Sequence, residues 1–121
     1  MHHKQERTNM KKNNYKVYYA TSENCFEGEK IADGISREAA REILESNIAD
    51  DIDYEGLTQD ELNAERDSIV AEAMSSGWVL FENSHKYEVL YIVTTNGRDA
   101  RRRINGFRRE ILRQMQNKFG N

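Results

Sequence analysis

The sequence predicts an α+β domain built from a small antiparallel sheet of about four strands and three helices, in the order ββααββα. Two observations favour this fold class. Segments rich in branched and aromatic residues come in two pairs, and the apolar residues that lie between and after these pairs recur at helical spacing. A chain of 121 residues can also bury a core without disulfides or a structural metal. We therefore expect one domain over residues 14–121, preceded by a polar tail over residues 1–13.

The first strand pair is expected at YKVYYA, residues 15–20, and around Ile31, because turn-forming residues separate the two segments. Ser36 follows and can cap a helix that is expected to end at about Ala49. The apolar face of this helix comprises Ile35, Ala39, Ala40, Ile43, Leu44 and Ile48.

The second helix has the clearest local signal in the chain. Thr58 and Glu61 have the spacing of a capping box, and Leu57 and Leu62 have that of a hydrophobic staple. Gly77 is placed to end the helix in a left-handed conformation. The apolar face comprises Leu62, Ile69, Val70, Ala73 and Met74.

The second strand pair and the last helix complete the predicted domain. WVLF, residues 78–81, is followed after a turn by YEVLYIVTT, residues 87–95, in which both alternating sets of side chains are apolar. Such a strand is expected at the centre of a sheet that is covered on both faces. Asp99 favours a helix N-terminus, and residues 98–121 are expected to form one helix. Its apolar stripe comprises Ala100, Ile104, Phe107, Ile111 and Met115, with Leu112 and Phe119 at the margin.

Charge is divided unevenly along the chain. The formal net charge is −3, but residues 38–72 carry twelve acidic side chains against two arginines, whereas residues 97–121 carry a net charge of +6. Six arginines fall within residues 98–110. The candidate anion-binding residues are Arg101, Arg102, Arg103, Arg108, Arg109 and Arg113. Helical geometry places Arg101 and Arg108 at the edge of the apolar stripe and Arg103 on the other flank beside Glu110. The opposite side carries Arg102, Arg109 and Arg113.

Two interpretations of the arginine helix follow. In the first, the helix is simply solvated, and the Arg101 and Arg108 side chains reach the acidic half of the same chain. In the second, the planar guanidinium groups bind phosphate or carboxylate groups of another molecule through paired hydrogen bonds. Three phosphate contacts would make the affinity for DNA fall about 40-fold between 50 and 200 mM salt. A sequence pI of about 5.7, and the lack of aromatic residues among the outward arginines, argue against a dedicated nucleic-acid domain.

The sequence therefore predicts a small non-enzymatic binding or regulatory protein whose C-terminal arginine helix contacts an anionic macromolecule, either a nucleic acid or an acidic protein. The alternative is an acidic protein antagonist of a nucleic-acid-binding enzyme, acting through residues 38–72. Phage anti-defence inhibitors, including anti-CRISPR-like ones, share this charge and size, but no motif here assigns the chain to such a family. The acidic partner surface would comprise Glu42, Glu45, Asp50, Asp51, Asp53 and Glu55.

Catalytic, metal and cofactor sites are not predicted. Cys25 and His85 could form a nucleophile and base only if the fold brought them together, and neither lies in a known catalytic motif. Residues 51–56 match the start of a calcium-binding loop, but Leu62 stands where the closing carboxylate is required. His2 and His3 are adjacent and do not make a metal site. We expect no cofactor.

The tyrosines allow a remote further interpretation, a small ligand-binding domain or enzyme that uses an aromatic patch on one face of the sheet. The residues concerned are Tyr15, Tyr18, Tyr19, Tyr87 and Tyr91. Cross-strand packing under the helices explains the same residues more simply.

The expected location is the cytoplasm, because the chain has one cysteine and no apolar run of membrane-spanning length. His2 and His3 have the character of a tag remnant, and Met10 that of a second start. No membrane association is expected. Charge complementarity between two copies would permit a homodimer.

Overall fold

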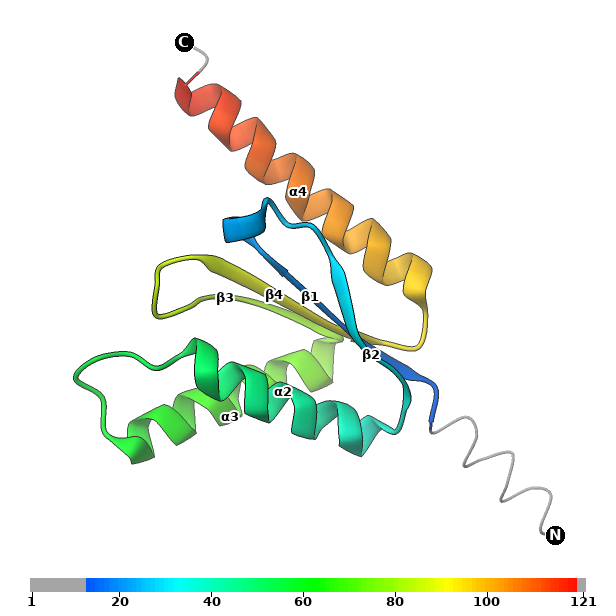
Figure 1. The fold of residues 1–121 in the computed structure, drawn as a ribbon, viewed down its shortest axis with the longest axis vertical. Helices are drawn as coiled ribbons and strands as arrows, with labels where there is room; N and C mark the ends of the chain where they lie inside the picture. The colour runs from blue at the N-terminus through cyan, green and yellow to red at the C-terminus, as the bar shows by residue number, and fades with distance from the viewer. Residues whose placement is uncertain (1–12, 120–121) are drawn as a thin grey trace, which may run out of the picture.

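The computed structural model describes residues 13–119 and shows four antiparallel strands in one sheet with three α-helices (Figure 1). The elements are β1 (Tyr15–Thr21), the 3₁₀ turn η1 (Ser22–Asn24), β2 (Glu29–Ile35), α2 (Arg37–Asp51), α3 (Gln59–Ser76), β3 (Trp78–Glu82), β4 (Glu88–Thr94) and α4 (Gly97–Phe119). The predicted α+β class and the order ββααββα are confirmed. Except for Asn13, the predicted tail over residues 1–13 lies outside the described residues.

The strands lie in the order β2-β1-β4-β3, with every neighbouring pair antiparallel. The β1–β2 hairpin and the β3–β4 hairpin therefore meet where β1 pairs with β4. This pairing runs from Lys16 opposite Thr94 to Thr21 opposite Val89. This arrangement places β4 inside the sheet, as its apolar sequence predicts. Two register irregularities occur where β1 pairs with β2.

The sheet separates α2 and α3 from α4, so the domain has three layers (Figure 1). In β4, the side chains of Val89, Tyr91 and Val93 pack towards α2 and α3, whereas those of Leu90 and Ile92 pack towards α4. Both faces of this strand are covered, because successive side chains in a strand point to opposite faces and both sets are apolar.

The layer formed by α2 and α3 follows the sequence signals closely. Ser36 caps α2, and Thr58 and Glu61 form a reciprocal capping box at the start of α3. Gly77 ends α3 with a φ of 86°, a left-handed conformation that glycine adopts without strain. The fully or nearly fully buried residues that these helices contribute are Ala40, Leu44, Ile48, Ile69, Val70 and Ala73. Helix α2 extends two residues beyond its predicted end at Ala49.

The opposite face has a smaller core between the sheet and α4. Ala100 and Ile104 of α4 are buried there, and Phe107 and Ile111 are partly buried against the same cluster. Leu112 is 49% exposed, which agrees with its predicted place at the margin of the stripe. The side chains of Met115 and Phe119 lie outside the described ones.

The connection between β1 and β2 packs under α4. Its Phe26 is fully buried and stacks on Phe107 of α4, with ring centroids 6.3 Å apart. Gly28 lies so close to α4 that a Cβ placed on it would be 2.6 Å from Cδ1 of Ile104. The loop therefore holds one end of the hairpin against the helix.

Candidate anion-binding groove

A groove runs between α4 and the part of the sheet formed by β1 and β2. Its volume is about 1220 Å³, and it is wide open to solvent. Seven of its lining residues are cationic: Lys16, Lys30, Arg98, Arg101, Arg102, Arg108 and Arg109. No aspartate or glutamate is among the described residues that line it. The groove is thus a concentrated site of positive charge in a chain whose net charge is negative.

The helix wall of the groove is set by the way α4 packs. Burial of Ala100 and Ile104 fixes the rotation of the helix about its axis, and at 100° per residue Arg101 and Arg108 then lie on the flank that faces β1. The acidic residues of α4, Asp99 and Glu110, fall on the other flank by the same geometry. The helix therefore turns its cationic flank towards the groove.

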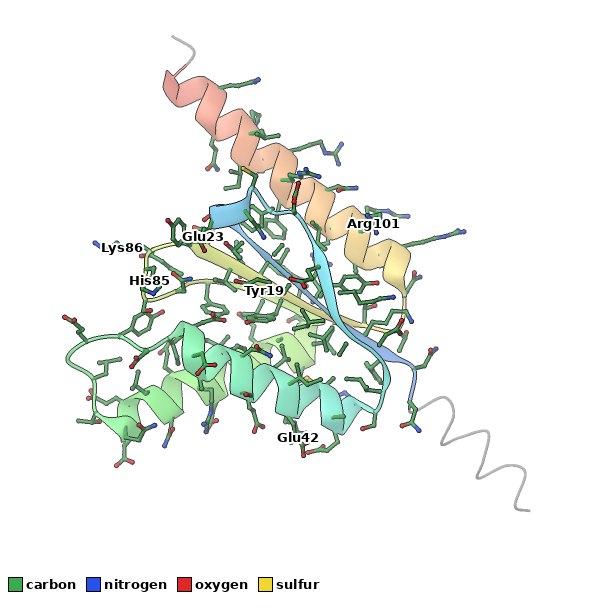
Figure 2. The ribbon with its side chains drawn as sticks, in the orientation of Figure 1. Tyr19, Glu23, Glu42, His85, Lys86 and Arg101 are labelled. Atoms are coloured by element: carbon green, nitrogen blue, oxygen red, sulfur yellow. The ribbon has the colours of Figure 1, made fainter. Side chains whose placement is uncertain are left out.

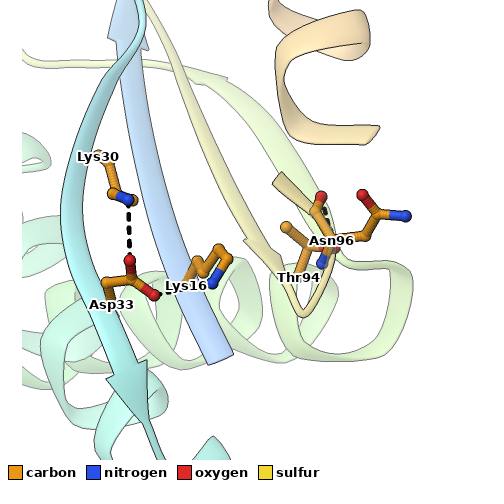
Figure 3. A network of polar contacts seen from close by, with 5 residues as sticks. All are labelled: Lys16, Lys30, Asp33, Thr94 and Asn96. Atoms are coloured by element: carbon orange, nitrogen blue, oxygen red, sulfur yellow. Dashed lines mark hydrogen bonds and ion pairs between the residues drawn. The ribbon is translucent and has the colours of Figure 1, made fainter. Parts of the chain in front are cut away.

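The sheet wall carries Lys16 from β1 and Lys30 from β2, held by one carboxylate (Figure 3). Nζ of Lys16 donates to Oδ1 of Asp33 at 2.8 Å, and Nζ of Lys30 donates to Oδ2 at 2.8 Å. These two hydrogen bonds lower the pKa of Asp33 to about 2. Since each ammonium group has three donors, both lysines keep donors free for a further anion.

The start of α4 closes one end of the groove. The backbone N–H of Arg98 donates to Oδ1 of Asn96 at 3.0 Å, and the N–H of Asn96 donates to Oγ1 of Thr94 at 3.0 Å (Figure 3). Asn96 therefore caps the helix. A Cβ placed on Gly97 would be 2.9 Å from the hydroxyl oxygen of Tyr18, so glycine allows α4 to approach the sheet closely at this point.

The ion pairs made by the described side chains of α4 are solvent-exposed. Arg102 lies 3.9 Å from Asp99, Arg113 lies 2.7 Å from Glu110, and Arg108 lies 3.9 Å from Glu27 in the β1–β2 connection. Exposed pairs of this kind contribute about 0–1 kcal/mol each. They leave the guanidinium groups accessible to another anion.

The interpretation in which Arg101 and Arg108 reach the acidic half of the chain is wrong. Among the side chains that the structure describes, no ion pair joins α4 to residues 38–72. The reason is topological, because α2 and α3 pack on the opposite face of the sheet. Figure 2 shows Arg101 and Glu42 pointing away from opposite sides of the molecule.

Two of the candidate arginines do not line the groove. Arg103 lies on the other flank of α4, where its guanidinium carbon is 4.7 Å from the centroid of the Trp78 ring. This is a cation–π contact that stabilises the packing of α4. Arg113 is exposed nearer the C-terminus and pairs with Glu110.

Sequence reasoning missed Lys16, Lys30 and Arg98 as residues of this site, and it named Tyr18 only as part of a tyrosine patch. Alternation along YKVYYA places Lys16 and Tyr18 on the face opposite Val17, which was a usable signal. The sequence did not show which helix would cover that face. The expectation that no aromatic residue accompanies the arginines holds along the helix but not in the folded groove, where Tyr18 is a lining residue.

The residues of the predicted acidic surface lie on α2 and in the α2–α3 connection. Glu42, Asp50, Asp53 and Glu55 are exposed, and Glu45 is half-buried. Asp51 differs, because its Oδ2 accepts a hydrogen bond of 2.6 Å from the Tyr91 hydroxyl. Burial raises the pKa of Asp51, although the hydrogen bond from Tyr91 opposes that rise. Asp51 is therefore a packing residue as well as a charged one.

The tyrosines do not gather on one face of the sheet, so that part of the remote interpretation is wrong. Tyr15, Tyr19 and Tyr91 pack with the core under α2 and α3, and the rings of Tyr19 and Tyr91 lie 5.2 Å apart. Tyr18 packs on the other face, towards α4. Tyr87 lies just before β4 and is 38% exposed.

Neither a metal cluster nor a thiol–imidazole pair is found among the described residues. No group of three or more histidine, cysteine, aspartate or glutamate side chains within residues 13–119 is arranged to hold a metal ion. The thiol of Cys25 is exposed, and over the same residues no hydrogen bond joins it to His85. Within this range, too, no helix combines the length and the hydropathy needed to cross a bilayer.

Comparison of the chain with protein-family models, with curated proteins and with solved structures gave no match in any of the three. The case for a functional site therefore rests on the groove itself.

Proposed function

We propose that this chain is a non-enzymatic binding or regulatory protein that holds the phosphate backbone of a nucleic acid in the groove between α4 and the β1–β2 hairpin. The single observation that carries the proposal is the composition of the groove, with seven cations and no carboxylate among its described lining residues. Cations from two walls converge on the same space, where each can neutralise a phosphate of a bound strand.

Nucleic acid is favoured over an acidic protein by the type and spacing of the cations. Five of the seven are arginines, whose fork-shaped guanidinium groups can bind phosphate oxygens in pairs. They follow one helix from Arg98 to Arg109, over a length of about 16 Å. A row of this kind matches a regular series of phosphates better than the irregular carboxylates of a protein surface.

The acidic overall charge does not oppose this proposal. The acidic helices lie beyond the sheet, and since a helix with its side chains is about 10 Å thick, their charges lie about 20 Å from the groove. The Debye length at physiological salt is about 8 Å, so most of their repulsion is screened before it reaches a bound strand.

The proposal is tested by fluorescence anisotropy with labelled DNA and RNA at 50 and 200 mM salt. We expect the Arg101→Glu/Arg108→Glu variant to bind about tenfold or more weakly, since two phosphate contacts become repulsive. The salt slope, which is the slope of the logarithm of affinity against the logarithm of salt concentration, should become less steep by roughly 1.5–2. The matched control is Arg41→Glu/Arg66→Glu, which makes the same charge change on the acidic layer and should change binding much less. Equal losses in the two variants, or no binding by the parent protein at 50 mM salt, would overturn the proposal.

A second candidate function is that of an acidic antagonist of a nucleic-acid-binding enzyme. It is favoured by the separation of charge, because α2 and the α2–α3 connection present Glu42, Asp50 and Asp53 on the side of the sheet away from the arginines of α4. The same experiment separates the two proposals. A parent protein that binds no nucleic acid, but reduces nucleic-acid binding by a basic enzyme, would support the antagonist.

A further inference from the structure

We propose that the groove accepts a single-stranded nucleic acid rather than a duplex, an inference that rests on the proposed function. The strand would lie along α4, with its phosphates between the arginines of the helix and the lysines of the sheet, and with one base against Tyr18. Three features of the groove carry this inference: its two walls, its charge asymmetry and its aromatic residue.

The first feature is that cations stand on both walls of a concave site. Lys16 and Lys30 rise from the sheet, and Arg101 and Arg108 face them from α4. A single backbone between the walls can contact both sets at once. A duplex is instead usually bound by an element that protrudes into its major groove, which is about 12 Å wide. Here the flank of α4 that carries Arg101 and Arg108 faces the sheet and does not protrude, whereas Arg102 and Arg109 point outward.

The second feature is the position of the carboxylates on α4. Asp99 pairs with Arg102, and Glu110 pairs with Arg113, on the side of the helix away from the sheet lysines. A duplex lying across the outside of α4 would bring phosphates close to these two carboxylates. A strand inside the groove avoids these two, and the carboxylates nearest to it, Asp33 and Glu27, are already paired with groove cations.

The third feature is Tyr18 on the sheet wall. Its ring is half-buried under the start of α4, and it is the one aromatic side chain among the described lining residues. Proteins that bind single strands combine a positive groove with aromatic rings on which unpaired bases stack. In a duplex the bases already stack on one another, so this ring would have no partner.

The size of the groove sets the length of the strand. The helix wall from Arg98 to Arg109 is about 16 Å long. At roughly 3.4 Å per nucleotide along a stacked strand, this wall accommodates about five nucleotides. Five phosphate contacts predict a salt slope of about −3.5 for a single strand. With this slope, the affinity falls about 100-fold between 50 and 200 mM salt.

The test compares a labelled 12-nucleotide DNA strand without self-complementarity, the RNA of the same sequence, and the blunt DNA duplex. Anisotropy titrations at 50 mM salt are expected to show either single strand binding about tenfold or more tighter than the duplex, because only the strand reaches both walls and the ring. A duplex that binds equally or more tightly would overturn the single-strand inference but leave the proposed function standing. Binding of none of the three would overturn both.

Variants of the sheet wall sharpen the test. Lys16→Gln/Asp33→Asn/Lys30→Gln removes both lysines and the carboxylate that joins them, and we expect it to flatten the single-strand salt slope by about 1.4. Tyr18→Leu should weaken single-strand binding about fivefold or more, whereas Tyr18→Phe, which keeps the ring, should retain most of it. Thermal unfolding of each variant checks that the fold is kept. Two results together would overturn the inference: full single-strand binding by a folded Tyr18→Leu protein, and an unchanged salt slope in the lysine variant. The strand would then bind outside this groove.

Discussion

The two faces of the sheet differ in how completely they are covered. Two helices, α2 and α3, cover one face and enclose a core that includes Leu44, Ile48 and Tyr91. One helix, α4, covers the other face over a smaller core that includes Leu90 and Ile104. The first face is closed and carries acidic side chains on its outer surface, whereas the second leaves an open groove lined with cations.

This difference shows how a small domain can keep a stable core and an open binding surface on one sheet. Four strands spaced about 4.8 Å apart span about 14 Å between the outer strands, and strand tilt adds to the area to be covered. One helix, about 10 Å wide, leaves part of such a sheet exposed. The uncovered part lies on β1 and β2, where the side chains facing α4 include Lys16, Tyr18 and Lys30 instead of aliphatic residues.

The largest expected effect comes from removing core side chains on the two faces. We expect Leu44→Ala to lower the free energy of unfolding by about 3–4 kcal/mol and Ile104→Ala by about 2–3 kcal/mol, because a fully buried leucine leaves a cavity that cannot collapse. Leu112→Ala, at an exposed position, should change it by about 0.5 kcal/mol or less. Urea denaturation measures all three. A larger loss for Ile104→Ala than for Leu44→Ala would mean that the α4 face supplies the dominant core.

An intermediate effect is expected where the β1–β2 connection meets α4. Gly28→Ala would place a Cβ 2.6 Å from Cδ1 of Ile104, and overpacking of this kind costs about 1–2 kcal/mol of stability. Ile104→Val removes that Cδ1 atom, so in a double-mutant cycle the second substitution should restore part of the loss.

The control for this contact is Gly106→Ala, which makes the same substitution inside α4. A Cβ at Gly106 meets no atom within 4 Å, so alanine should stabilise the helix by about 0.5–1 kcal/mol. Strictly additive effects of Gly28→Ala and Ile104→Val would show that the loop does not press on the helix.

The smallest expected effect concerns Asp51 on the closed face. Burial raises the pKa of Asp51 in the folded protein, so the folded state binds its proton more tightly than the unfolded state. The contribution of Asp51 to the free energy of unfolding therefore falls as the pH rises from the ordinary aspartate pKa of about 4 to the raised pKa of the folded state. Above that raised pKa the contribution is constant. Asp51→Asn keeps an acceptor for the Tyr91 hydroxyl and removes this decline.

Urea denaturation between pH 3 and pH 7 measures this effect as the difference between the parent protein and the variant. The variant should gain stability relative to the parent as the pH rises through this window. Asp53→Asn makes the same charge change at an exposed site and should show a weaker trend. A constant difference between parent and Asp51→Asn at all pH values would contradict the assigned direction.

Much of the fold could be predicted because its signals are local or periodic. The capping box at Thr58 and Glu61, the left-handed Gly77 and the double alternation in β4 each fix the backbone or the burial of a few neighbouring residues. The β1–β2 connection was harder to predict. It was expected to be a simple turn, but it contains a 3₁₀ turn and left-handed residues at Cys25 and Phe26. Burial of the Phe26 ring against α4 favours this conformation, and that contact is not local.

The sequence by itself determined the α+β class, the element order, the apolar stripe of α4 and the number of cations on its remaining surface, since these depend on residue type and spacing along one element. Only the tertiary structure decided that α4 packs on the face opposite α2 and α3, and so which charges meet. That choice separates the arginines from the acidic helices and brings Lys16, Lys30 and Tyr18 beside them. The physical reason is that a groove between two elements depends on how the sheet pairs and which face each helix covers, and both are set by contacts between residues far apart in the chain.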